Sequence, residues 1–142
     1  WTLLEDFFEH MDEAPAPSIV FFDPFSSKTN YSFWCVENLA RVREKAERCA
    51  TGAELFTYSA STAVRASLLA AGFYVAKGAP TGPKGETTIA CTEKALAWRS
   101  GQLLGADWLG KWERSDAKWP LTLSDEPEPE WLERVKGHRQ FR

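Results

Sequence analysis

The sequence has few cysteines, no long apolar run and no excess of basic charge, and each shortage excludes a class of protein. The three cysteines, Cys35, Cys49 and Cys91, are widely spaced and form no CxxC pair, so neither a metal site nor a disulfide framework is predicted. We expect reduced thiols in a cytoplasmic protein. No stretch approaches the roughly 18 apolar residues that cross a bilayer, so no membrane partner is expected.

The charge of the chain is close to balance. It carries 17 Lys and Arg against 20 Asp and Glu, which gives a formal net charge of −3. Such a protein has no overall attraction to nucleic acid, so any contact with phosphates must come from a local basic patch. The 44% of apolar residues, with seven Trp and nine Phe among them, are enough for a hydrophobic core.

The hydrophobic pattern predicts an α/β fold. Four segments have the length and composition of strands, namely 18–23, 54–59, 73–77 and 86–92. Apolar residues spaced three and four apart predict a helix over about 31–49, and a second helix begins at Ser61 or Thr62 and stops at Gly72. Strands that alternate with helices are typical of an α/β sheet. The last two strands are joined by a loop without a helix, so we expect them to be antiparallel neighbours.

The two ends of the chain differ from this pattern. Residues 2–7 are predicted to form a short strand, followed by a helical turn. The segment 94–142 is rich in Trp and interrupted by Gly and Pro, with a short helix predicted from about 128 to 136. We interpret its Trp side chains as packing anchors, with a platform for base stacking as the alternative. The chain is therefore divided into an α/β domain, 1–93, and a C-terminal extension that packs on it.

The most informative stretch is IVFFDPFSSKTN at residues 19–30, where an apolar run ends abruptly at Asp23, Pro24 and Phe25. In open α/β sheets, ligands bind at the carboxyl ends of the strands. A carboxylate at that place, beside an aromatic ring and a proline carbonyl, suits the binding of an amino group. The same residues are equally compatible with a purely structural strand end.

Three blocks of residues, in order, resemble the methyltransferase half of MnmC-type tRNA modification enzymes. The blocks are FFDPFSSKTNYSFW, LFTYSASTAVRASLLAAGF and GAPTGPKGET, and the resemblance covers about residues 1–93. The positions that fit the family pattern are Asp23, Phe25, Asn30, Trp34, Thr57, Tyr58, Ser59, Ala60, Val64, Arg65, Ala71, Gly72, Phe73, Lys84 and Glu86. The resemblance implies a Rossmann-like fold, S-adenosylmethionine as cofactor, and methylation of the aminomethyl group of the wobble uridine in tRNA.

The chain also departs from the family pattern. Pro24 stands where the family usually has Gly, Tyr31 where Pro is common, and Gly85 where an Arg is usual, and these changes bear on the exact substrate. No GxGxG cofactor loop occurs, so we expect that loop upstream of Trp1. By the family's strand order, the chain carries the C-terminal part of a mostly parallel sheet with an antiparallel last strand. It lacks the first two strands, and an upstream segment or a second copy is expected to complete the sheet.

The resemblance also implies roles for single residues. Asp23 and Phe25 are the predicted catalytic residues, because the carboxylate would orient the amine and the ring would wall the pocket. Asp6 and Phe7 are predicted to contact the cofactor together with Asp23 and Pro24, and for Asp6 a helix N-cap is an equal alternative. The predicted substrate contacts are Lys28, Asn30, Arg65 and Lys84, for which a solvated surface or, for Asn30, a helix cap is the alternative.

Two other functions stay open. One is a non-catalytic, methyltransferase-like module that binds RNA or protein without cofactor, which the missing glycine loop favours. The other is a small-molecule amine N-methyltransferase, which the acidic balance and Gly85 favour. We expect the chain to act as part of a longer N-methyltransferase and to be inactive alone.

Overall fold

The computed structural model describes residues 3, 6–81, 85–124, 126 and 128–142. Its sheet has four strands in the order β1-β2-β4-β3. The strands are β1 (Ile19–Phe21), β2 (Glu54–Thr57), β3 (Tyr74–Gly78) and β4 (Thr87–Cys91). β1 runs parallel to β2, whereas β4 lies antiparallel to both β2 and β3. The predicted α/β class and the predicted antiparallel pairing of the last two strands are confirmed.

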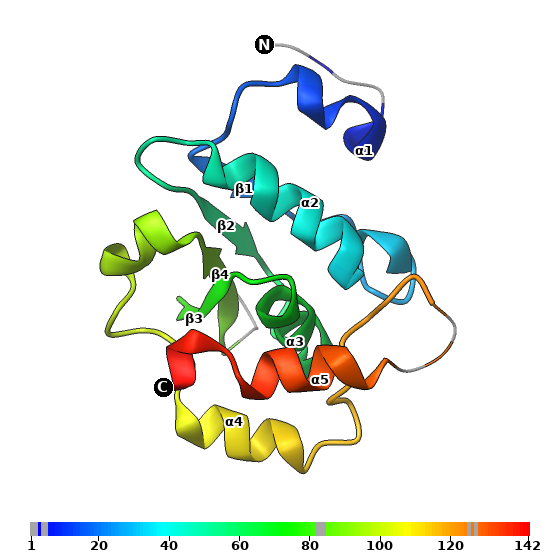
Figure 1. Cartoon of the computed structure of the whole chain (residues 1–142), viewed down its shortest axis with the longest axis vertical. Helices are drawn as coiled ribbons and strands as arrows, with labels where there is room; N and C mark the ends of the chain where they lie inside the picture. The colour runs from blue at the N-terminus through cyan, green and yellow to red at the C-terminus, as the bar shows by residue number, and fades with distance from the viewer. Residues whose placement is uncertain (1–2, 4–5, 82–84, 125, 127) are drawn as a thin grey trace.

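Five α-helices accompany the sheet in the described residues (Figure 1). They are α1 (Phe7–His10), α2 (Val36–Glu47), α3 (Thr62–Ala70), α4 (Ala106–Glu113) and α5 (Pro129–Lys136). Short 3-10 turns, η1 to η4, cover Met11–Glu13, Tyr31–Trp34, Glu93–Trp98 and Arg139–Phe141. No helix in the part of the chain that the structure describes is both long and apolar enough to cross a membrane.

The first long helix starts later than its apolar spacing predicts. Tyr31–Trp34 forms a 3-10 turn, and Cys35 is extended at φ −70° and ψ 146°, so α2 begins only at Val36. The turn places Trp34 in the core, where its side chain is 1% exposed. The predicted end of α3 is confirmed, because Gly72 follows the helix at φ +94°, a conformation that favours glycine.

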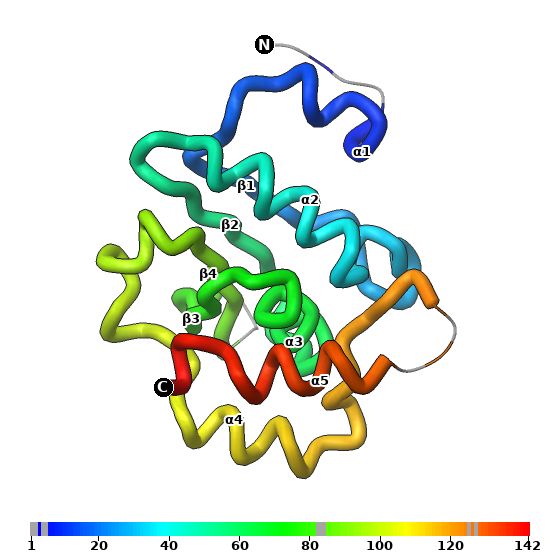
Figure 2. Tube along the Cα trace, viewed as in Figure 1, coloured from blue at the N-terminus to red at the C-terminus, as the bar shows by residue number. Residues whose placement is uncertain are grey.

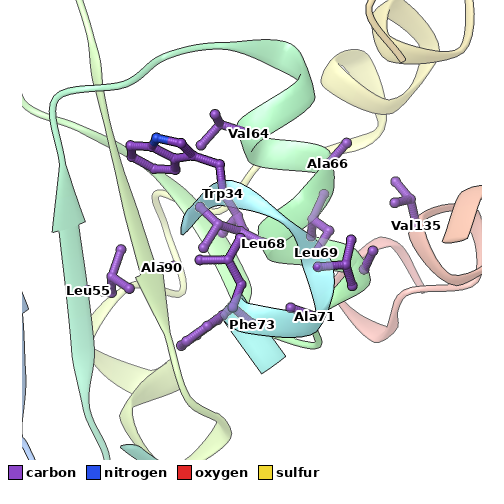
Figure 3. Close-up of a cluster of buried hydrophobic side chains, with 14 of the residues drawn as sticks. Trp34, Leu55, Val64, Ala66, Leu68, Leu69, Ala71, Phe73, Ala90 and Val135 are labelled. Carbon is purple, nitrogen blue, oxygen red and sulfur yellow. The ribbon is translucent and has the colours of Figure 1, made fainter. Parts of the chain in front are cut away.

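The main core lies between one face of the sheet and helices α2, α3 and α5 (Figure 3). Leu55 and Ala90 point from the sheet toward Leu68 and Val64 on α3, and Val135 of α5 closes the far side. A smaller cluster on the opposite face joins Tyr74 and Cys91 to η3. The strands therefore carry apolar side chains on both faces, as expected for a sheet covered on both sides.

The C-terminal extension contributes directly to this core. Trp112 on α4 is 1% exposed, and its indole N–H donates to the carbonyl oxygen of Lys118 at 2.7 Å. Trp108 stacks on both Trp112 and Phe141, with ring centroids 6.3 and 6.2 Å away. The tube view shows α4 and α5 at the same end of the molecule, with α4 below α5 in this view (Figure 2). These Trp side chains act as packing residues.

The predicted strand at residues 2–7 is wrong at its described end. Phe7 is the first residue of α1, because Asp6 is extended and its carboxylate accepts a hydrogen bond from the Glu9 amide at 2.9 Å. Residues 1–2 and 4–5 of that prediction lie outside the described residues. Within the described chain, β1 has β2 as its strand neighbour and stands at one edge of the sheet.

Candidate active site

Asp23 lies just after the carboxyl end of β1, as predicted. The β1–β2 ladder ends where the Phe22 amide donates to the carbonyl of Phe56 at 2.9 Å, and Asp23 follows directly. One carboxylate oxygen, Oδ1, accepts two hydrogen bonds of 2.9 Å, from the Thr57 hydroxyl and from the Tyr58 amide. No described residue bonds to the second oxygen, Oδ2, and Asp23 forms no ion pair within the described chain.

A cavity of about 260 Å³ opens beside this carboxylate. Its described lining residues are Phe21, Asp23, Phe56, Thr57, Tyr58, Ala79, Thr81, Thr87, Thr88 and Ile89. Asp23 is the one charged side chain among them, and the rings of Phe21 and Phe56 lie 5.8 Å apart on the strands below it. The negative charge of the carboxylate attracts an amine and repels a phosphate, and the aromatic rings that line the cavity suit a flat ring that carries the amine.

Phe25 adopts a strained backbone conformation next to the site. Its φ is +56°, which is unusual for a bulky residue and costs on the order of 1–3 kcal/mol. The turn is held because the Phe25 amide donates to the Asp23 carbonyl at 2.8 Å and the Trp34 indole donates to the Phe25 carbonyl at 3.3 Å. The Phe25 ring is 79% exposed. The fold thus presents a large aromatic ring to solvent two residues beyond the carboxylate.

The two predicted cofactor residues from the N-terminal segment lie near the same strand end. The ring of Phe7 is 5.9 Å from that of Phe22, the residue before Asp23, and it is 39% exposed. Asp6 is the N-cap of α1, because its Oδ1 accepts from the Glu9 amide, so the helix-cap alternative for Asp6 is confirmed for that oxygen. A second cavity, of about 290 Å³, runs between α1 and β1 with an almost entirely apolar lining that includes Phe7, Met11 and Ile19.

The predicted contact between Arg65 and a phosphate receives no support from its surroundings. Arg65 is 3% exposed, and its guanidinium donates to the Thr88 hydroxyl, the Glu86 carboxylate and the Thr87 carbonyl, each at 3.0 Å. Burial by itself raises the pKa of Glu86, but the positive charges of Arg65 and Lys77 outweigh burial and hold that pKa below its usual value. Arg65 therefore ties α3 to β4 inside the protein.

The other predicted substrate residues are scattered. Lys28 is exposed in the segment after Phe25, whereas Asn30 is half-buried and precedes the 3-10 turn without a side-chain capping bond. Lys84 lies outside the described residues. Among the residues that the structure describes, no cluster of His, Cys, Asp and Glu is arranged to hold a metal ion.

Sequence reasoning missed two residues that shape the site, the Thr57 hydroxyl and the Trp34 indole. Both positions fit the family pattern, but nothing in their spacing showed what they would contact. A threonine near the carboxyl end of a predicted strand, two positions before Ser59, was the available signal for Thr57. The indole bond of Trp34 to residue 25 spans nine positions through a turn, which no periodicity encodes.

The fold and the site together define a partial Rossmann-like methyltransferase sheet with a carboxylate at a strand mouth. The profile of a family described as S-adenosyl-L-methionine-dependent methyltransferase matches residues 4–93, more than half of the chain. The chain belongs to this family, whose cofactor is S-adenosylmethionine.

Among solved structures, the chain is similar to MnmC2 from Aquifex aeolicus, with a TM-score of 0.65 and 26% sequence identity. The alignment covers 94% of this chain and 44% of that chain, so the present chain spans less than half of its solved relative. The comparison with curated proteins finds no match.

Proposed function

We propose that this chain supplies the amine-binding side of an S-adenosylmethionine-dependent methyltransferase that acts on the aminomethyl group of the wobble uridine in tRNA. The observation that carries the proposal is Asp23, whose Oδ1 is held by two donors while Oδ2 has no partner among the described residues. The aromatic rings that line the cavity beside it fit a nucleobase that carries an amine. The resemblance to MnmC-type enzymes and the similarity to MnmC2 favour tRNA as the source of that base.

The described residues fit one side of the cofactor. Pro24 and Asp23 follow the end of β1, and the exposure of Phe7 and its contact with the Phe22 ring support a role in packing on an adenine. Bound S-adenosylmethionine supplies an electrophilic methyl group on a sulfonium centre. Toward it, the chain's own residues orient the acceptor: Asp23 Oδ2 and the Pro24 carbonyl accept N–H bonds and aim the nitrogen lone pair.

Asp23 also provides a place for the proton. Methylation forms an N–C bond and breaks an S–C bond, whose electron pair stays on sulfur, and the nitrogen must then lose a proton. A carboxylate within hydrogen-bond reach of that nitrogen accepts the proton or passes it to water. The exposure of Phe25, whose backbone carbonyl accepts from the Trp34 indole, supports a role in stacking on the base.

The test is methyl transfer to tRNA whose wobble uridine already carries an aminomethyl group, by the chain joined to the polypeptide that completes its sheet. Nucleoside analysis of the wobble uridine detects the product, and calorimetric titration measures the binding of S-adenosylmethionine. We expect saturable cofactor binding and a new methylaminomethyl group. Asp23→Asn is expected to lower the transfer rate by about 10²–10⁴-fold, while the exposed control Asp116→Asn leaves it unchanged. Near-normal turnover of Asp23→Asn would remove Asp23 from the reaction.

The same assay separates the alternatives. Transfer to small amines but not to tRNA would favour a small-molecule N-methyltransferase, for which the net charge of −3 is the supporting observation. Saturable RNA binding without cofactor binding would favour a non-catalytic module.

We also propose that additional polypeptide completes the sheet at the edge of β1. The side chains of Ile19 and Phe21 are 56% and 83% exposed there, although parallel strands are normally covered on both faces. A molar mass of twice the chain mass in sedimentation equilibrium would identify a second copy as that polypeptide. A monomer that gains cofactor binding when extended by an N-terminal segment would identify the segment instead.

A further inference from the structure

Two runs of hydrogen bonds, which meet at the backbone of Ser59, connect the buried Arg65 and the Asp23 carboxylate. The Arg65 Nε–H donates to the Thr88 hydroxyl at 3.0 Å, and that hydroxyl donates to the Ser59 carbonyl at 2.6 Å. The Ser59 amide in turn donates to the Thr57 hydroxyl at 3.1 Å, and the Thr57 hydroxyl donates to Asp23 Oδ1 at 2.9 Å. The loop after β2 is therefore fixed from the β4 side and from the β1 side.

The direction of each hydrogen bond follows from chemistry. A guanidinium and a backbone amide only donate, while a carbonyl and an ionised carboxylate only accept. Each threonine hydroxyl must therefore accept on the side of its N–H partner and donate on the other side. The single proton of Thr57 is committed to Asp23 Oδ1, and the Tyr58 amide donates to the same oxygen.

We propose that Thr57 is the positioning residue of the site: its hydroxyl, with the Tyr58 amide, anchors Oδ1 and keeps Oδ2 turned out for the substrate amine. This inference rests on the proposed amine-binding role of Asp23. Because the Thr57 hydroxyl and the Tyr58 amide both donate to Oδ1, rotating the carboxylate away would leave both donors without this partner. The two bonds therefore favour one orientation of the carboxylate. Buried Arg65 and Thr88, which are 3% and 1% exposed, support the arrangement from behind.

The test replaces Thr57 by Val, which keeps the shape and removes the hydroxyl, and by Ser, which restores it. A matched control is Thr92→Val at the opposite end of the sheet, where a buried threonine hydroxyl accepts a hydrogen bond from the Ala53 amide at 2.8 Å. The first readout, hydrogen exchange of the Tyr58 amide by NMR, needs no activity. We expect about tenfold faster exchange in Thr57→Val, with Thr57→Ser and Thr92→Val close to the unmodified chain.

The second readout is methyl transfer. Thr57→Val is expected to lower kcat by about 10–10²-fold at an unchanged KM for S-adenosylmethionine, and Thr57→Ser is expected to recover most of the loss. If the chain joined to the polypeptide that completes its sheet transfers no methyl group to any amine, the proposed function fails and the exchange measurement alone decides on Thr57. Unchanged Tyr58 exchange in Thr57→Val, or an equal increase in Thr92→Val, would overturn the positioning role.

Discussion

The two edge strands of the sheet differ in whether other segments of the described chain cover them. At the β3 edge, residues 102–104 bond along the strand: the Lys77 amide donates to the Gln102 carbonyl at 3.0 Å and the Leu104 amide donates to the Val75 carbonyl at 2.9 Å. The Gln140 side chain closes the same edge, since it accepts from the Val75 amide at 2.8 Å and donates to the Val75 and Leu104 carbonyls.

The β1 edge has no such cover among the described residues. Ile19 and Phe21 are exposed, and the apolar groove between α1 and β1 runs beside them. Native proteins usually protect an edge strand with charge, proline or a covering segment. The C-terminal extension makes β3 a covered boundary of the fold, whereas β1 is an edge strand without such a cover in the part of the chain that the structure describes. Asp23 lies at the end of β1 and so borders that side.

The largest expected effect comes from the extension that covers β3. Trp112→Ala should lower the free energy of unfolding by about 3–5 kcal/mol, because a fully buried indole is replaced by a cavity. Urea denaturation measures the loss, and Trp98→Ala is the control, because Trp98 is 53% exposed. A loss in Trp112→Ala no larger than in the control would mean that the extension is not part of the core.

The second largest expected effect is a dependence of the free energy of unfolding on pH, which comes from His138 in the C-terminal extension. Burial, together with the charge of Arg43, lowers the pKa of His138 from 6.5 to about 4. The neutral form is favoured in the folded chain, so the full stability is present above pH 6.5 and up to about 3 kcal/mol is lost as the pH falls to 4. Urea denaturation across this range should show the loss, and His138→Gln should reduce it.

A smaller loss is expected for Gln140→Ala, which removes the three side-chain bonds that close the β3 edge. We expect about 1–3 kcal/mol, because the Val75 amide and the Leu104 carbonyl lose this partner at a half-buried edge, while the Val75 carbonyl keeps the Leu104 amide. Gln102→Ala is the control, since its side chain accepts one bond from Arg99 on the exposed surface. Equal losses in the two variants would mean that Gln140 does not seal the edge.

The smallest effect on stability is expected at the uncovered edge. Phe21→Lys should change the free energy of unfolding by no more than about 0.5 kcal/mol, because the side chain is 83% exposed. The same substitution should lower any concentration-dependent association seen by sedimentation, whereas Tyr31→Lys, at a 46% exposed residue away from the strand, should not. A large loss of stability in Phe21→Lys would show that the edge is already covered.

Much of the fold was predictable because it depends on local patterns. The apolar spacing of Leu39, Val42 and Ala46 indicated one buried helix face, and Gly72 marked the end of α3. The site was predictable to the extent that Asp23 follows an apolar strand. The late start of α2 was not, because it depends on the Val36 amide bonding to the Leu121 carbonyl, 85 positions further along the chain.

The sequence alone determined the order of the four strands, the presence of helices α2, α3 and α5, and the carboxylate that follows β1. Helix and strand periods, glycine stops and apolar runs are properties of neighbouring residues. Only the tertiary structure decided what each polar side chain does. Arg65, predicted on the surface, is buried against Thr88, and Thr57 faces Asp23 across 34 positions. Hydrogen-bond partners are chosen by which strands pair and in which register, and that information arises only when the chain is folded.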